Sequence, residues 1–478
     1  KSSFDDLATI TMKTYGYKRT QIIRLENFQA STYTYNNDKI NRTAIYDSSF
    51  FRSKQGSLET IKFTFPDLKE GSIIEYSYDL VVPSLGIIPP WQFQSKYPKL
   101  ASEYTIEIPS VNNLLTITNG TLTANEDTVT HLNVDYMSPE HKWMFPSIKK
   151  DTADKNTTRH RWVYENVPAL KKENYVSNTD DYLQSIQFYK LGMASIFSDS
   201  IDGDWQFPID RMLNDEDFGL SLSLGNAFLN DDVRDAIGDT KDTLAKARKI
   251  YYSIKNNCTC IDDDGVYLTK TFKDVTKTKR GNVADINLLL EASLLKAGIN
   301  ALPVIISTRG NGKPLDTYPV IARYNYVIVV AYINGKTYLL DAADKDASFG
   351  LPANKCYNGA GRVVANPTYL LPSLSADSLT ETSVTTCFFL REGGDTISGR
   401  VTTVLGNMES IDLRNKIQET SVEDYFRELK KQYPFDVEMQ EMGIDSLSAE
   451  QSENPVSVHY DVNFEPEGDV YYFNPMLN

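Results

Sequence analysis

The side chains of this sequence best suited to catalysis are thiols and imidazoles, since a thiolate and an imidazole together perform nucleophilic acyl transfer. The chain has four cysteines and four histidines, which are Cys258, Cys260, Cys356, Cys387, His131, His141, His160 and His459. Residues 166–365 hold three of these cysteines but no histidine. A local Cys–His pair is therefore not indicated.

Motifs for metals and cofactors are also missing from the sequence. Cys258 and Cys260 lack the second half of a zinc-ribbon spacing, and the ten-residue separation of His131 and His141 is unspecific. The loop at residues 262–265 resembles a calcium loop, but its first and last ligand positions are not acidic. No Gly-x-Ser-x-Gly elbow, dinucleotide fingerprint or P-loop occurs. The sequence predicts no metal and no cofactor.

A buried helix is predicted from Val283 onward, because apolar residues surround nearly the whole segment as far as Leu295. Asn282 suits the N-cap, and Gly298 suits the left-handed residue that ends a helix. The first turn of such a helix is where the backbone dipole lowers the pKa of a thiol. Val283 occupies that position, and a valine supplies no nucleophile.

Two strands, at residues 326–333 and 336–341, flank Asn334-Gly335, a strong two-residue hairpin signal. Continued pairing would place Tyr326 opposite Ala343, with Asp341 as its diagonal neighbour on the same face. Diagonal neighbours lie roughly 5–8 Å apart, close enough for a base and the carboxylate that orients it. The scaffold is thus predicted to bring Tyr326 and Asp341 together.

The sequence segments around these positions resemble the core of bacterial transglutaminase-like domains, which have a papain-like cysteine fold. They read Arg-Gly-Asn-Val-Ala-Asp at 280–285, Tyr-Asn-Tyr-Val-Ile at 324–328 and Leu-Leu-Asp-Ala at 339–342. Members of that family read Gly-Asn-Cys, Asn-His-Val and Leu-Asp-Ala at the matching places. The resemblance implies that Val283 replaces the catalytic cysteine and Tyr326 the catalytic histidine, whereas Asp341 is retained.

These replacements predict a degenerate triad, that is, a triad without its nucleophile and its base. The pKa of a tyrosine is ordinarily about 10, so Tyr326 is a poor general base near neutral pH. No other cysteine is expected near Val283, because Cys258 and Cys260 lie beyond a long loop. Val283 is interpreted as core packing, Tyr326 as a strand aromatic and Asp341 as a hydrogen-bonding remnant. The former cleft that they line is also a candidate binding site, with Tyr326 as a hydrogen-bond donor.

The whole chain of 478 residues is predicted to be an α+β multidomain protein. Alternating apolar residues with Pro and Gly turns predict an antiparallel β-sandwich for residues 1–165. Residues 166–365 are assigned to the transglutaminase-like core with a helical lead-in. Residues 366–478 are assigned to a β-rich domain with one helix, capped by Ser421.

The flanking domains extend the resemblance. Residues 68–76 and 91–98 resemble a bacterial β-rich domain of unknown function that often precedes transglutaminase-like cores. Residues 471–477 resemble a companion C-terminal β domain, which is expected to be incomplete in this chain. Members of the family are usually exported by Gram-negative bacteria, which implies a periplasmic or cell-surface location.

Charge and hydropathy restrict the function further. The net charge is −15, so a nucleic-acid partner is not expected, and no apolar run approaches the roughly 20 residues of a membrane span. The leading hypothesis is a non-catalytic protein that binds or scaffolds a peptide, protein or glycan. The alternatives are a hydrolase or transferase that uses no cysteine and has an unrecognised site, and an architectural protein of the cell envelope. An open polar cleft at Val283 would favour binding, and a cleft plugged by side chains would favour architecture.

Overall fold

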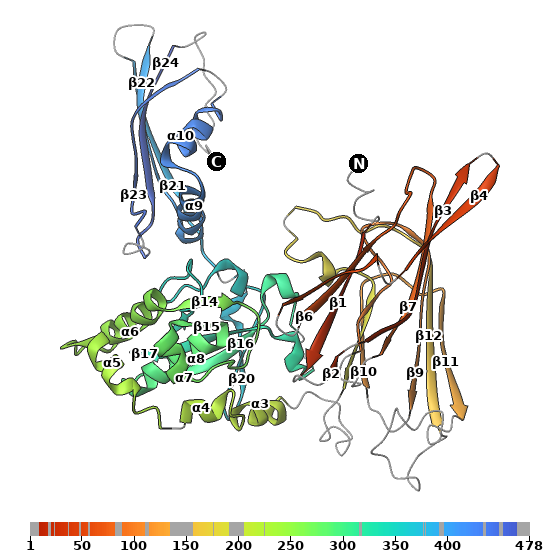
Figure 1. Cartoon of the computed structure of the whole chain (residues 1–478). Coiled ribbons are helices and arrows are strands. Elements are labelled where there is room, and N and C mark those ends of the chain that lie inside the picture. The colour runs from red at the N-terminus through yellow and green to blue at the C-terminus, as the bar shows by residue number, and fades with distance from the viewer. Residues whose placement is uncertain are drawn as a thin grey trace. The chain divides into compact units, whose positions relative to one another are not determined.

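The structure is a computed structural model (Figure 1). It describes residues 9–17, 21–22, 24–36, 38–46, 49–55, 58–81, 88–109, 114–133, 156–174, 176–190, 205–223, 225–314, 318–375, 377, 379–391, 396–433, 436–448 and 453–465. The chain divides into two compact units, residues 1–172 with 182–199, and residues 173–181 with 200–478. None of the described helices is long and apolar enough to cross a membrane. The three-domain division made from the sequence stays a prediction.

The first unit is built from antiparallel strands. Their bounds are β1 Thr9–Tyr17, β2 Gln21–Ile22, β3 Arg24–Asn36, β4 Lys39–Ile45, β5 Phe51–Gln55, β6 Leu58–Thr64, β7 Ile73–Val81, β8 Trp91–Gln92, β9 Lys99–Pro109, β10 Leu114–Asn119, β11 Glu126–Asn133, β12 Asn156–Val167 and β13 Ser185–Lys190. They form sheets in the orders β2-β1-β6-β5, β4-β3-β7, β10-β13-β8 and β11-β12-β9.

Alternation of side chains explains how these sheets pack. Ile61 and Phe63 on β6 point to one face and pack with Ala30 of β3 and Ile45 of β4, so two of the sheets share a core. This face-to-face packing agrees with the β-rich character expected from the alternating sequence. None of the predicted triad positions lies in this unit.

The second unit contains a mixed α/β core (Figure 1). Its helices are α3 Gln206–Leu213, α4 Gly219–Ser223, α5 Leu229–Ile237, α6 Thr243–Asn257, α7 Phe272–Thr278 and α8 Val283–Lys296. Its strands are β14 Thr259–Asp262, β15 Arg280–Asn282, β16 Asn300–Ile306, β17 Tyr326–Ile333, β18 Lys336–Leu340, β19 Gly361–Val363 and β20 Tyr369–Leu371. The last five form a sheet in the order β18-β17-β16-β19-β20, and β14 pairs in parallel with β15.

Helix α8 is the centre of this core. Almost every residue from Val283 to Leu294 is buried, as the apolar sequence predicted. One side of the helix packs Ala284 and Leu288 against α3 and α7, and another packs Ile286 and Leu290 against α6 and the sheet. The core therefore holds the N-terminus of α8 in a fixed position relative to β17 and β18.

The predicted hairpin between β17 and β18 is confirmed. Ile333 pairs with Lys336, and Asn334 and Gly335 adopt positive φ angles of 52° and 75°. The ladder ends at the pair Val329–Leu340, three pairs before the predicted Tyr326–Ala343 pair. Beyond Leu340 the backbone leaves the strand to bond to α8 instead.

The rest of the second unit is a four-stranded antiparallel sheet covered by helices on one face (Figure 1). Its elements are β21 Val384–Arg391, β22 Ile397–Val404, α9 Asn407–Glu419, α10 Val422–Lys430, β23 Glu438–Asp445 and β24 Ser457–Phe464. The Ser421 cap of α10 is confirmed, because its side chain accepts from the backbone of Asp424. The prediction of a single helix here is wrong. Helix α9 lacks a clean apolar stripe, since it buries Ser410 and Arg414 as well as Ile411 and Leu413.

Candidate functional site

The first turn of α8 is built around a double cap. The Asn282 side chain accepts a hydrogen bond from the Asp285 backbone at 2.7 Å, and the Asp285 carboxylate accepts one from the Asn282 backbone at 2.9 Å. The same carboxylate also accepts from the backbone and hydroxyl of Thr269. A Cβ on Gly281 would lie 2.6 Å from the Cβ of Asp285, so the close approach requires glycine there. These contacts fix Val283 as the first residue of α8.

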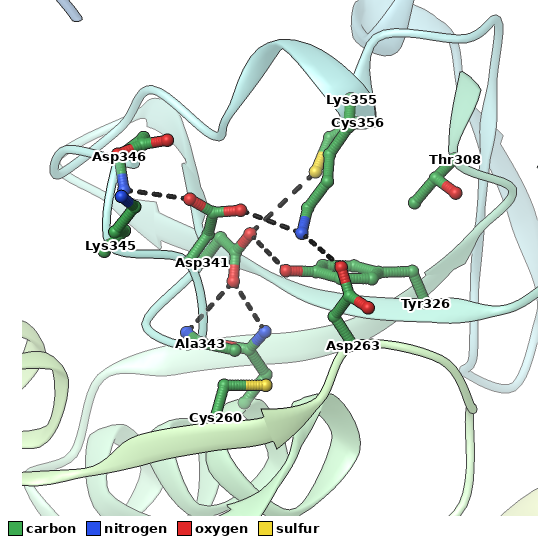
Figure 2. Close-up of polar contacts among 12 residues, drawn as sticks. Cys260, Asp263, Thr308, Tyr326, Asp341, Ala343, Lys345, Asp346, Lys355 and Cys356 are labelled. Carbon is green, nitrogen blue, oxygen red and sulfur yellow. Dashed lines mark hydrogen bonds and ion pairs between the residues drawn. The ribbon is translucent and has the colours of Figure 1, made fainter. Parts of the chain in front are cut away.

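Tyr326, Asp341 and Asn287 form one buried hydrogen-bond network. The Tyr326 hydroxyl donates to Oδ2 of Asp341 at 2.9 Å (Figure 2). Nδ2 of Asn287 on α8 and the backbone of Ala343 donate to the other oxygen of Asp341, at 2.9 and 3.1 Å. Oδ1 of Asn287 accepts from the Ala342 backbone at 2.8 Å. This network ties the end of β18 and the start of β17 to the central helix.

Burial changes the chemistry of both ionisable members. Val283, Tyr326 and Asp341 each have an exposed fraction of 0%. Burial, followed by the charge of Asp341, raises the pKa of Tyr326 far above its ordinary value. Burial and the charge of Asp344 also raise the pKa of Asp341, against the opposing effect of its hydrogen bonds. Tyr326 is therefore a hydrogen-bond donor that cannot accept a proton from a substrate or thiol.

Lys355, in a short 3₁₀ turn at Asn354–Cys356, covers the network from outside (Figure 2). Its ammonium group lies 4.8 Å from the centre of the Tyr326 ring and forms ion pairs with Asp344 at 2.8 Å and Asp263 at 3.0 Å. Burial alone would lower the pKa of Lys355, but the two carboxylates outweigh it and raise that pKa. Lys355 is thus a fixed charge that closes the site rather than a nucleophile.

The expectation that no other cysteine lies near Val283 is wrong. Cys356 belongs to the same buried cluster as Val283 and Tyr326, and its sulfur lies 3.9 Å from Oδ2 of Asp341. Cys260 packs against the same cluster. Burial and the charge of Asp341 raise the pKa of Cys356, and burial raises the pKa of Cys260 to about 11. Both groups remain thiols at neutral pH, so neither is an activated nucleophile.

A polar cavity of about 650 Å³ lies outside the closed network. Its walls carry lysines, aspartates and the two neighbouring thiols, and the lining residues include Lys255, Lys355, Asp262, Asp263, Asp344, Asp346, Cys258 and Cys260. Val283, Tyr326 and Asp341 are not among the lining residues. A ligand in this cavity would contact Lys355 and the lining aspartates, but not Val283, Tyr326 or Asp341.

The structure brings together the three residues singled out from the sequence, and Tyr326 contacts Asp341 although the β17–β18 ladder ends at the pair Val329–Leu340. Asn287, Lys355 and Cys356 were not found from the sequence. A polar side chain four residues after Val283, on a helix that is otherwise apolar, was a usable signal for Asn287. Lys355 and Cys356 follow the hairpin in an irregular segment that carries no periodic pattern.

Comparison with known proteins shows a relationship in fold. No family model matches the sequence, and no curated protein matches it. A crystal structure described as that of a candidate protease from Parabacteroides distasonis is similar, with 12% identity and a TM-score of 0.53, over 97% of this chain and 87% of that chain. A second structure, described as a candidate cysteine protease from Cytophaga hutchinsonii, has 12% identity over 61% of this chain and 86% of that chain, with a TM-score of 0.22.

At 12% identity the first likeness shows a shared fold and nothing about activity. It extends over nearly the whole chain, so both the β-rich unit and the α/β core contribute to it. The chain is therefore a multidomain α+β protein that shares its fold with the structure from Parabacteroides distasonis.

Proposed function

We propose that this chain is a non-catalytic protein on a transglutaminase-like core, and that it acts in scaffolding or binding outside the cytoplasm. The observation that carries the proposal is the buried network of Tyr326, Asp341 and Asn287 beside Val283, closed by Lys355. Val283 and Tyr326 stand in place of the two reactive groups, and hydrogen bonds engage the carboxyl group of Asp341. The printed description of the similar structure as a candidate protease is not carried over to this chain.

The chemical argument rests on what thioester chemistry requires. A thiolate must attack the carbonyl, and an imidazole must transfer the proton to the leaving group. Val283 has no heteroatom, and the raised pKa of Tyr326 prevents it from acting as a base. Cys356 is near but buried, and its raised pKa keeps it protonated. The site thus lacks both partners of the reaction.

Between the two non-catalytic roles, the closed site favours architecture. A triad position with no exposed surface cannot touch a ligand, so Val283, Tyr326 and Asp341 stabilise the core instead. Scaffolding in the cell envelope of a Gram-negative bacterium, in its periplasm or at its surface, is the form of this role that the sequence resemblance favours.

A binding role is the second candidate, and the 650 Å³ cavity supports it. That volume lies within the ~300–1,000 Å³ typical of ligand pockets. The lining carries hydrogen-bonding groups of both charges, which suit a peptide or a glycan better than an apolar ligand. In this role the ligand would be held by Lys355 and the aspartates around it, not by the former triad.

Turnover assays on the purified chain test the proposal. Amidase, peptidase and acyl-transfer substrates are expected to give no turnover above a buffer control. Turnover that disappears in Asp341→Asn would overturn the proposal, because it would mean that the closed site reacts. Turnover that survives Asp341→Asn and co-purifies with the chain would instead support a cysteine-independent enzyme with another site.

Binding and architecture are separated by a second measurement. Peptide and glycan arrays probed with the wild-type chain and with Lys355→Ala would report on the cavity. Binding that is lost in Lys355→Ala and kept in Lys336→Ala would support the binding role, since Lys336 is the exposed first residue of β18 and lies outside the cavity lining. Absence of binding in both would favour architecture.

A further inference from the structure

The ammonium group of Lys355 is surrounded by groups of the kinds that bind ammonium ions (Figure 2). It lies 4.8 Å from the centre of the Tyr326 ring, 2.8 Å from a carboxylate oxygen of Asp344 and 3.0 Å from one of Asp263. An aromatic face attracts a cation through its quadrupole, and carboxylates accept hydrogen bonds from its N–H groups. The ring begins β17, and the two carboxylates follow β18 and β14, so the fold assembles them from three separate segments.

Burial distinguishes this arrangement from an ordinary surface ion pair. The Tyr326 ring has no exposed surface, and the side chain of Asp344 is 11% exposed. A contrast is given by Lys416, whose ammonium group lies 2.6 Å from Glu428 and 5.6 Å from the centre of the Tyr425 ring. The two charged side chains of that pair are 46% and 57% exposed, so water competes for both charges. A desolvated site holds a cation more strongly than such a surface pair.

The cavity of about 650 Å³ gives access to this arrangement from outside. Its lining includes Lys355 and the two carboxylates that bind it. The Tyr326 ring is not part of the lining, and the lysine ammonium group lies over it. A molecule in the cavity can therefore reach the ring only where the lysine has moved aside.

We propose that the Tyr326 ring and the two carboxylates form a binding site for a primary alkylammonium ion, and that Lys355 blocks this site from within the chain. The tether gives the lysine a high effective concentration at the site, so an amine in solution must compete with it. The wild-type site is therefore closed, and removal of the lysine side chain opens it.

The surrounding groups select the class of ligand. The bound lysine shows what fits: one positive charge, several N–H donors and a slim alkyl chain. Two carboxylates repel an anion, and a neutral hydroxyl would leave their charge without compensation. A quaternary ammonium ion has no N–H donor, so it could use only the ring. The inference goes beyond the proposed function, because it holds whether or not the intact chain binds a peptide or a glycan.

Chemical rescue of the full chain tests the proposal. Lys355→Ala removes the propylammonium part of the side chain, and we expect the midpoint of thermal unfolding to fall by several degrees. Propylammonium chloride is expected to raise this midpoint again and to saturate, whereas sodium chloride at equal ionic strength is not. Calorimetric titration should show propylammonium binding to the variant at least tenfold more tightly than to the wild type. A variant that stays unfolded in both salts would overturn the proposal, because the bound amine should restore the lost contacts.

Lys416→Ala is the matched control, since it removes an exposed lysine beside a carboxylate and a tyrosine ring. It is expected to gain no affinity for propylammonium. Adding Asp344→Asn to Lys355→Ala should weaken the binding at least tenfold, and tetramethylammonium should bind Lys355→Ala more weakly than propylammonium does. Equal binding by the two lysine variants, or binding that Asp344→Asn leaves unchanged, would indicate general attraction of cations to an acidic chain and would overturn the proposal.

Discussion

The two halves of helix α8 hold buried polar side chains in opposite ways. In the first half, Asn287 donates to Val327 and Asp341 and accepts from Ala342. One turn later, Glu291 is equally buried, but its Oε2 has no hydrogen-bond partner among the residues that the structure describes. The same helix therefore contains a satisfied polar network and an unsatisfied carboxyl group.

This difference shows what keeps a buried polar group in place. Three donors reach the Asp341 carboxyl, so the network fixes the end of β18 against α8. No donor among the described residues reaches Oε2 of Glu291, and burial raises the pKa of that group well above its ordinary value. Hydrogen bonds compensate the burial of Asp341, whereas Glu291 can be buried because it remains protonated.

The largest expected effect comes from breaking the satisfied network with Asp341→Ala. The change removes the acceptor of the Tyr326 hydroxyl and of the Ala343 backbone, and one of the two acceptors of the Asn287 amide. We expect the free energy of unfolding to fall by about 4 kcal/mol, since each buried orphan donor costs about 1–3 kcal/mol and the costs overlap. Urea denaturation followed by circular dichroism measures it.

Asp341→Asn is the matched control, because it keeps the shape and one acceptor oxygen. It is expected to cost about 2 kcal/mol, roughly half the loss of the alanine variant. An alanine variant as stable as the wild type would mean that the network contributes nothing to the fold.

The second largest effect on stability is expected for Glu291→Gln, and this effect depends on pH. The unfolded chain releases the Glu291 proton above about pH 4.3, while the folded chain keeps it because the folded pKa is raised. The folded state then binds more protons, so the stability of the wild type falls as pH rises from that point, by about 1.4 kcal/mol per pH unit. Glutamine does not titrate and escapes this loss.

The variant should therefore gain on the wild type as pH rises above the unfolded pKa, for as long as the folded wild type keeps its proton. Urea titrations of both proteins at a series of pH values measure the difference. A difference that does not change with pH would show that Glu291 is ionised in the folded chain, and the contrast with Asp341 would disappear.

The smallest expected effect is that of Asn282→Ala, which removes one side of the cap of α8. The Asp285 backbone amide would lose its partner, and we expect a loss of about 1 kcal/mol, typical for an N-cap. Asn282→Ser retains a capping oxygen and should recover most of that stability. Thermal unfolding of the three proteins compares them, and equal midpoints would mean that the core alone fixes the helix start.

Local sequence rules predicted much of the site. The N-cap at Asn282 and the Asn334-Gly335 turn depend on neighbours within a few residues, and both are confirmed. The predicted contact between Tyr326 and Asp341 is present, but the strand pairing ends at Val329–Leu340. The bonds of Asp341 to Asn287 and to the Ala343 backbone therefore hold it there, rather than the register of the hairpin. Helix α9 was missed because its buried side includes Ser410 and Arg414, which weakens the periodic signal.

The sequence alone determined which groups are absent: position 283 has no thiol, position 326 has no imidazole, and residues 166–365 contain no histidine. Tertiary structure alone decided that Lys355 closes the site and that Cys356 lies beside Asp341. The physical reason is how far along the chain the interacting residues lie from one another. A missing functional group is a property of one residue, whereas burial and contacts between an irregular loop and a hairpin depend on how distant segments pack.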